Sequence, residues 1–130
     1  MISIQAQIRQ EHYKTSIRSE LNTLVADEPV SHGGEEKGFS PSGLLASSLG
    51  ACTCITLRMY ADRKQWPLDG VDVEVSLEWS AEKQQTNINR NITLMGALSD
   101  DQRERLLQIA NQCPVHKMLS HPIHIQSQFL

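Results

Sequence analysis

The feature that most constrains this chain is a long uncharged segment that begins at Pro41. Serine at position 40 is a preferred N-cap, and proline costs no hydrogen bond at the first helical position. Because no further proline follows until Pro67, we predict a helix from Pro41 to Lys64, roughly 35 Å long at about 1.5 Å per residue. Its first four turns carry no charge on any face and are rich in glycine, alanine and serine. Such a helix has to be surrounded and closely approached by other backbones.

The segments on both sides of this helix alternate in the manner of β-strands. Apolar residues recur among polar ones within residues 1–26, which predicts two or three short antiparallel strands. Residues 27–39 collect proline, glycine and acids without a period, and this predicts a loop. After the helix, strict alternation over Val71–Trp79 and again over Ile88–Leu94 predicts an antiparallel hairpin with one solvated face.

The last third of the chain predicts two short helices and a strand. A serine followed three residues later by glutamine is a capping box, and it precedes an amphipathic helix predicted over Asp100–Asn111. Cys113 and Pro114 start a short third helix, and the alternation at 123–129 predicts a closing strand. The expected fold is therefore α+β, a long central helix packed against antiparallel β-sheet in one domain of residues 1–130.

Size and charge limit the possible partners. A chain of 130 residues with 39% hydrophobic content leaves much surface exposed, and the apolar helix is too long for one protomer to cover, so we expect a homodimer. The net charge of −3, with scattered basic residues, argues against nucleic acid. The N-terminus lacks the pattern of a secretory signal, and we expect no stretch that reaches the roughly 18 apolar residues of a membrane span. The expected location is the cytoplasm.

Three cysteines, Cys52, Cys54 and Cys113, carry the candidate chemistry. An odd number of cysteines without an export signal favours reduced or redox-cycling thiols over a structural disulfide framework. If the fold brings Cys52 and Cys113 together, one can be oxidised by a peroxide to a sulfenic acid and the other can condense with it. At a helix start, the unpaired N–H groups and the helix dipole would stabilise a thiolate at Cys113.

Two other interpretations of the cysteines stay open. Buried free cysteines often serve only as small apolar residues, and Cys54, which points about 200° away from Cys52 on a helix, is interpreted as packing. A metal site is disfavoured, because the chain has neither a C-x-x-C pair nor a helical H-x-x-x-H pair, and His121 and His124 would point to opposite faces of a strand. His116 follows Cys113 by three residues and is either a surface residue or part of the same cavity.

Several segments together resemble the OsmC/Ohr family of osmotically inducible and organic hydroperoxide resistance proteins. The resemblance covers nearly the whole chain and looks closest to the smaller OsmC-like redox proteins. Its most specific part is a cysteine eleven residues after a proline on the long helix, combined with a Cys-Pro-Val helix start. The matching segments are SPSGLLASSLGACTCITLRMYADRK, WPLDGVDVEV, INRNITLMG and DDQRERLLQIANQCPVHKML.

The resemblance implies an intertwined homodimer whose two long helices lie back to back, wrapped by antiparallel sheets, with two active sites at the interface. It also implies that Cys52 is the peroxidatic cysteine and Cys113 the resolving cysteine. No bound cofactor is implied; an external dithiol, such as a lipoylated protein, would restore the thiols.

One family position is missing from this chain. In hydroperoxide-reducing members an acid follows the proline on the central helix and works with an arginine from the N-terminal strands of the partner chain. Here Ser42 and Gly43 follow that proline. The candidates for a supporting role in this chain are Arg18, Arg9, Glu28, Glu35, Glu36, Ser42 and His116.

These observations lead to two functional hypotheses. The first is a thiol peroxidase for organic hydroperoxides, an antioxidant or stress-response enzyme whose apolar substrate pocket would come from the central helix. The second is a non-catalytic module that senses redox state or binds a small apolar ligand, and the missing acid favours it. The expected pocket residues are Leu44, Leu45, Leu49, Ile55 and Met59.

Overall fold

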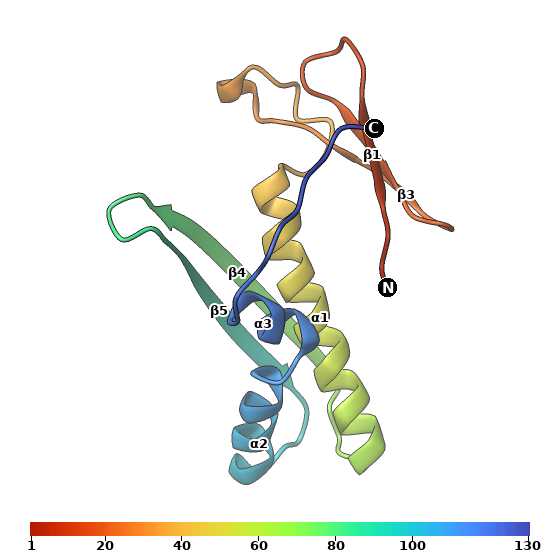
Figure 1. The fold of residues 1–130 in the computed structure, drawn as a ribbon. Helices are drawn as coiled ribbons and strands as arrows, with labels where there is room; N and C mark the ends of the chain where they lie inside the picture. Colours follow the sequence, from red (N-terminus) through yellow and green to blue (C-terminus); the bar gives the residue numbers. More distant parts are fainter. The chain divides into compact units, whose positions relative to one another are not determined.

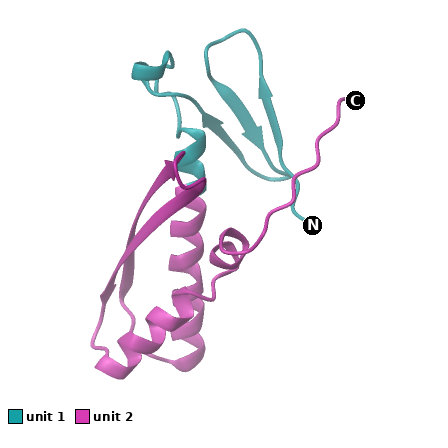
Figure 2. Cartoon of the chain, turned by 60° about the vertical axis from the view of Figure 1, so that its left-hand side comes forward, with its two compact units in different colours: residues 1–45 teal, residues 46–130 magenta.

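The computed structural model describes residues 1–130, which form two compact units, residues 1–45 and residues 46–130 (Figure 2). The long helix α1, Pro41–Lys64, begins in the first unit and continues through the second. The α+β class predicted from the sequence, with a long helix and antiparallel sheets, is confirmed (Figure 1).

The first unit contains a three-stranded antiparallel sheet, as the alternation predicted. Its strands are β1 (Gln5–Ile8), β2 (Thr15–Arg18) and β3 (Thr23–Ala26), in the order β1-β2-β3. The side chains of Ile8 and Leu24 are 46% and 45% exposed, so this unit alone does not bury the apolar positions of its sheet.

A loop with a single turn of 3-10 helix, Val30–His32, leads from β3 to α1. Asp27 organises this loop from a buried position. One of its carboxylate oxygens accepts hydrogen bonds from the backbone N–H groups of Tyr13 and Glu28, and the other accepts from those of Glu35 and Lys37. This carboxylate therefore adds four hydrogen bonds to the backbone hydrogen bonds that hold the loop, such as those from Asp27 to Phe39 and from Glu36 to Glu28.

Helix α1 has the bounds that the sequence predicted. The Ser40 hydroxyl accepts a hydrogen bond from the backbone N–H of Gly43 at 3.0 Å, which is the geometry of an N-cap. Arg63 and Lys64 lie in the last turn, where cations oppose the negative end of the helix dipole.

In the second unit, a long hairpin packs against α1. The hairpin consists of β4 (Gly70–Ser80) and β5 (Gln85–Met95), paired antiparallel along their whole length. Helix α2 (Asp100–Ala110) and helix α3 (Pro114–Leu119) follow, and α2 has the predicted capping box. The core lies where α1, α2 and the hairpin meet, and it consists of Leu57, Tyr60, Ala61, Leu68, Leu106, Ile109 and Ala110.

Two predictions were wrong. Residues 121–130 form no strand, because the apolar side chains of that segment find no neighbouring strand within the chain; Ile125 is 83% exposed. The expectation that no segment is apolar enough for a membrane span also fails. Helix α1 meets that criterion by length and composition, with 28% of its most apolar window buried. One such helix is weak evidence, since the core helix of a soluble protein passes the same test.

Candidate functional site

Cys52 lies in the middle of α1 and is half-buried. The next residue, Thr53, is fully buried, and its hydroxyl donates to the carbonyl of Leu49 at 2.7 Å. The thiol of Cys54 points instead toward β4, 3.8 Å from the carbonyl of Val71. This contact with β4 supports the interpretation of Cys54 as a packing residue.

Cys113 caps the start of α3 and is completely buried. Its sulfur accepts a hydrogen bond from the backbone N–H of His116 at 3.3 Å, and Pro114 occupies the first helical position. This is the predicted helix start. All three cysteines are free thiols in this structure.

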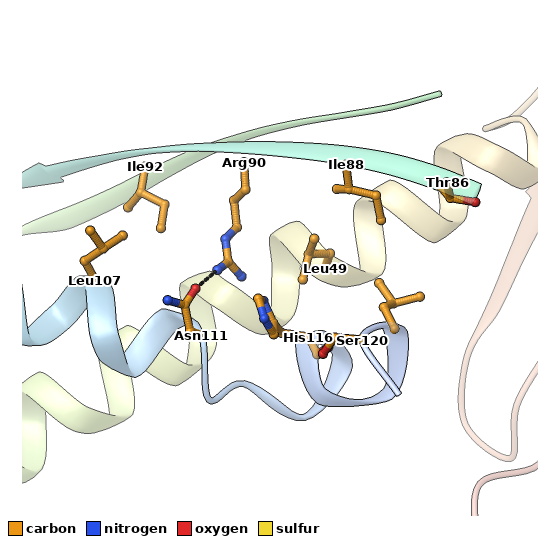
Figure 3. A pocket seen from close by; sticks show the side chains of 10 residues that line it. Leu49, Thr86, Ile88, Arg90, Ile92, Leu107, Asn111, His116 and Ser120 are labelled. Carbon is orange, nitrogen blue, oxygen red and sulfur yellow. Dashed lines mark hydrogen bonds between the residues drawn. The ribbon is translucent and has the colours of Figure 1, made fainter. Parts of the chain in front are cut away.

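Arg90 joins the two segments that carry Cys52 and Cys113. From β5 its guanidinium donates to the Thr53 hydroxyl at 3.1 Å and to the carbonyl of Ala110 at 3.2 Å. A further N–H donates to the side-chain oxygen of Asn111 at 2.8 Å (Figure 3). Thr53, which follows Cys52, and Ala110, three positions before Cys113, are therefore both hydrogen-bonded to Arg90.

The sequence reasoning missed Arg90, although a signal was present. Ile88, Ile92 and Leu94 occupy the inward phase of the strand alternation, and Arg90 falls on that same phase. A charged residue on the buried face of a strand needs polar partners, because desolvating it without them is costly. A charged residue at an inward position of a strand therefore indicates a structural or functional role.

His116 lies at the wall of a cavity of about 460 Å³, beside Arg90 (Figure 3). Partial burial, and then the positive charge of Arg90, lower the pKa of His116 below its ordinary value of 6.5. The sequence left His116 as a surface residue or as part of a cavity shared with the cysteines; the structure places it at a cavity that none of the three cysteines lines.

A second cavity, of about 420 Å³, is bordered by the segments that carry both cysteines. Thr56, one turn beyond Cys52, lines it together with Gln112 and Pro114, the two neighbours of Cys113. The other lining residues are Met59, Tyr60, Arg63, Arg105 and Ile109.

Tyr60 in this second cavity is surrounded by cations. The guanidinium of Arg105 donates to its hydroxyl at 3.1 Å, and this hydrogen bond is the main reason why the pKa of Tyr60 lies below its ordinary value. Arg63 and Lys64 lie 5.7 and 5.8 Å from the ring centroid. An anion entering this cavity would meet positive charge.

The predicted apolar pocket on α1 does not form as one site. Leu49 is buried and lines the 460 Å³ cavity, whereas Met59 lines the 420 Å³ cavity. Leu45 and Ile55 are 41% and 54% exposed, and Leu44 lines neither cavity. The five residues lie within an arc of about 140° on the helix but extend over about four turns, so no single cavity reaches all of them.

The other candidate supporting residues lie in the first unit, whereas both cysteines lie in the second. Arg18 donates to the side chain of Gln5, and Arg9 donates to the carbonyl of Ile8. Glu35 pairs with Lys37 at 2.9 Å, and the carbonyl of Glu28 accepts from the backbone N–H of Glu36. Ser42 is exposed in the first turn of α1.

No group of three or more histidine, cysteine, aspartate or glutamate side chains gathers in the geometry of a metal site.

Comparison with known proteins decides the family. A family model described as OsmC-like protein matches residues 33–128, which include Cys52, Arg90 and Cys113. The chain belongs to the OsmC-like protein family. The match confirms the resemblance identified from the sequence. No curated protein matches the chain.

Solved OsmC-like structures share the fold. The chain is 27% identical to an osmotic stress induced and detoxification response protein from Psychrobacter arcticus 273-4, with a TM-score of 0.79 over 94% of this chain and 90% of that one. An OsmC like protein from Mycoplasma pneumoniae is 20% identical, with a TM-score of 0.79 over 92% and 86% of the two chains. An organic hydroperoxide resistance protein OsmC from Legionella pneumophila is 22% identical, with a TM-score of 0.68 over 92% and 89%.

Proposed function

We propose that this OsmC-like protein is a thiol peroxidase that reduces organic hydroperoxides, with Cys52 as the attacking and Cys113 as the resolving cysteine. The observation that carries the proposal is the position of Arg90, which bonds the neighbour of Cys52 and the end of the helix that precedes Cys113. Proteins of the same fold that are described as organic hydroperoxide resistance proteins support the choice of substrate class.

The exposure of the two thiols supports this division of roles. Cys52 is half-buried, whereas Cys113 is fully buried. The attacking sulfur has to meet a molecule from outside, and the resolving sulfur only has to meet the oxidised partner. Cys52 is therefore the better placed of the two to react first.

The proposed cycle has three steps. The Cys52 thiolate attacks the distal oxygen of ROOH, the O–O bond breaks, and RO⁻ leaves and takes a proton to become ROH, which leaves Cys52 as a sulfenic acid. The Cys113 thiol then attacks the Cys52 sulfur, and water is released as the disulfide forms. An external dithiol, for which a lipoylated protein is a candidate, supplies the two electrons that restore both thiols.

The 420 Å³ cavity is the proposed entrance for the peroxide. It borders both cysteine segments, and Met59 and Ile109 provide apolar wall for an organic tail. Arg63 and Arg105 provide cations near the place where negative charge develops on the leaving oxygen. Arg18 or Arg9 from a partner chain is a second possible source of that charge.

A homodimer is part of the proposal. Ile55 and Met59 lie on one face of α1, and they are 54% and 65% exposed. An exposed apolar face of this kind is typical of an interface. We propose an intertwined dimer in which this face is covered by the second copy, and we place the protein in the cytoplasm.

Replacing the cysteines one at a time tests the proposal. With cumene hydroperoxide and dihydrolipoamide, we expect Cys52→Ser to lose peroxide consumption and Cys54→Ser, a matched control on the same helix, to keep it. Cys113→Ser should consume about one equivalent and then stop as a sulfenic or sulfinic acid, detected by mass spectrometry. Undiminished turnover by Cys52→Ser would disprove the proposal.

A non-catalytic redox sensor or ligand-binding module is the second candidate function. It is favoured by one observation, the absence of an acid after Pro41, where Ser42 is exposed instead. A sensor would react stoichiometrically with peroxide. Repeated turnover in the presence of dihydrolipoamide would exclude it, whereas a single oxidation that dihydrolipoamide does not convert into turnover would support it.

A further inference from the structure

The 460 Å³ cavity of the second unit is separate from the 420 Å³ cavity proposed as the entrance for the peroxide. It lies between β5, α2, α3 and the middle of α1, and none of the three cysteines lines it (Figure 3). Five of its ten lining residues are aliphatic, and the other five are polar or charged. The apolar lining residues are Leu49, Ile88, Ile92, Leu107 and Leu119.

Arg90 places an unbalanced positive charge in this cavity. Three hydrogen bonds go to neutral oxygens, on Thr53, Ala110 and Asn111, and a guanidinium has five N–H donors. No ion pair in the structure includes Arg90, and no acid lines the cavity. A half-buried cation that lacks a counter-ion is costly, and an anion that entered the cavity would relieve this cost.

The other polar groups of the cavity suit an anion as well. Because burial and Arg90 lower the pKa of His116, its imidazole is neutral near pH 7 and adds no second full charge. It still offers an N–H group, and so does the amide of Asn111. The site therefore presents one full positive charge and neutral donors beside an aliphatic wall.

We propose that this cavity binds a small molecule with one carboxylate and an aliphatic body. The carboxylate would pair with the free donors of Arg90, since a planar fork matches a guanidinium, and a single negative charge balances a single cation. The aliphatic part would lie along Leu49, Ile88 and Leu119. A volume of about 460 Å³ is within the range of small-ligand pockets. This proposal goes beyond the peroxidase function and does not depend on it.

Calorimetry on the full-length reduced protein tests the charge requirement. Octanoate is the probe, and octan-1-ol, which has the same chain without the charge, is its control. We expect octanoate to bind at least tenfold more tightly, and we expect Arg90→Gln to remove that preference while Arg90→Lys retains part of it. Equal binding of both probes, or no binding of octanoate, would overturn the proposal.

A second pair of variants tests the location without touching Arg90. Leu107→Trp changes an exposed residue at the cavity wall, and Met118→Trp changes an equally exposed residue outside it; the two side chains are 57% and 56% exposed. We expect only Leu107→Trp to weaken octanoate binding, by tenfold or more. If both variants bind octanoate as the wild type does, the cavity is the wrong site. Repeating the titration with Cys52→Ser, which should bind normally, separates this outcome from failure of the peroxidase proposal.

Discussion

Single residues in this protein hold together segments that have no regular structure in common. Arg90 joins α1 to the end of α2 through side-chain and backbone oxygens. Asp27 does the same for the loop before α1, where its carboxylate accepts four backbone N–H groups. In both places one buried or half-buried charge satisfies several polar groups that would otherwise lose their hydrogen bonds to water.

Asp27→Asn should destabilise the first unit at neutral pH. Burial raises the pKa of Asp27, but the hydrogen bonds from Lys37, Glu28, Tyr13 and Glu35 outweigh it, so the pKa lies below its ordinary value of 3.8. The ionised Asp27 carboxylate therefore contributes its full stabilisation of the folded state at pH values above 3.8. This stabilisation is lost as the pH falls through the lower pKa of the folded state. In Asp27→Asn, an amide NH₂ group replaces one carboxylate oxygen, and it cannot accept the hydrogen bonds that two backbone N–H groups donate to that oxygen.

Urea unfolding of the wild type and Asp27→Asn between pH 6 and pH 3 measures this effect. The difference between their midpoints should be largest at pH 6 and should shrink below 3.8, the ordinary pKa of the acid. Glu20→Gln, at an exposed acid, is the control and should behave as the wild type does. A difference that stays constant with pH would contradict the assigned role.

At the scale of elements, local signals define where the helices begin. Ser99 and Gln102 exchange the two hydrogen bonds of a capping box at the start of α2. This helix carries Leu106 and Ile109 into the core and ends next to Cys113. A cap at one end of α2 therefore supports both the core and the position of Cys113.

Ser99→Ala should lower the free energy of unfolding by about 1 kcal/mol, because one backbone N–H of the first turn loses its acceptor. Denaturant unfolding followed by circular dichroism measures this change. Ser127→Ala, in the exposed C-terminal segment, is the control and should stay within about 0.5 kcal/mol of the wild type. An equal decrease in the free energy of unfolding in both variants would show that the cap makes no specific contribution to stability.

At the scale of the whole molecule, the exposed apolar residues argue for assembly. Ile55 and Met59 lie on α1, and apolar side chains of the C-terminal segment, Ile123 and Ile125, are also exposed. The alternation of that segment is a strand pattern without a strand partner within the chain. A second copy that supplies cover would explain both observations.

Ile55→Glu should convert the proposed dimer into a monomer, since a charge on this face would be desolvated at the interface. Light scattering coupled to gel filtration measures the mass. Val30→Glu is the matched control, because Val30 is an exposed apolar residue outside α1, at 67% exposure. A wild type that runs as a monomer of 14.6 kDa would refute the proposed dimer.

The sequence by itself determined the local structure of this protein. The N-cap at Ser40, the alternation of the hairpin and the capping box at Ser99 depend on neighbours a few residues apart, and the structure has the predicted elements at these places. Periodicity also indicated a strand at 123–129, but a strand exists only where a second strand pairs with it, and no local pattern provides one.

Only the tertiary structure decided the site. Arg90 is 38 residues beyond Cys52 and 23 before Cys113, and its contacts to both segments arise from packing of the hairpin against α1 and α2. The cavity at His116 and the division of the predicted apolar pocket on α1 between two cavities have the same origin. Helical and strand periodicity predicts which face of its element a residue occupies. The side chains that pack against that face come from a distant part of the chain, and periodicity does not predict them.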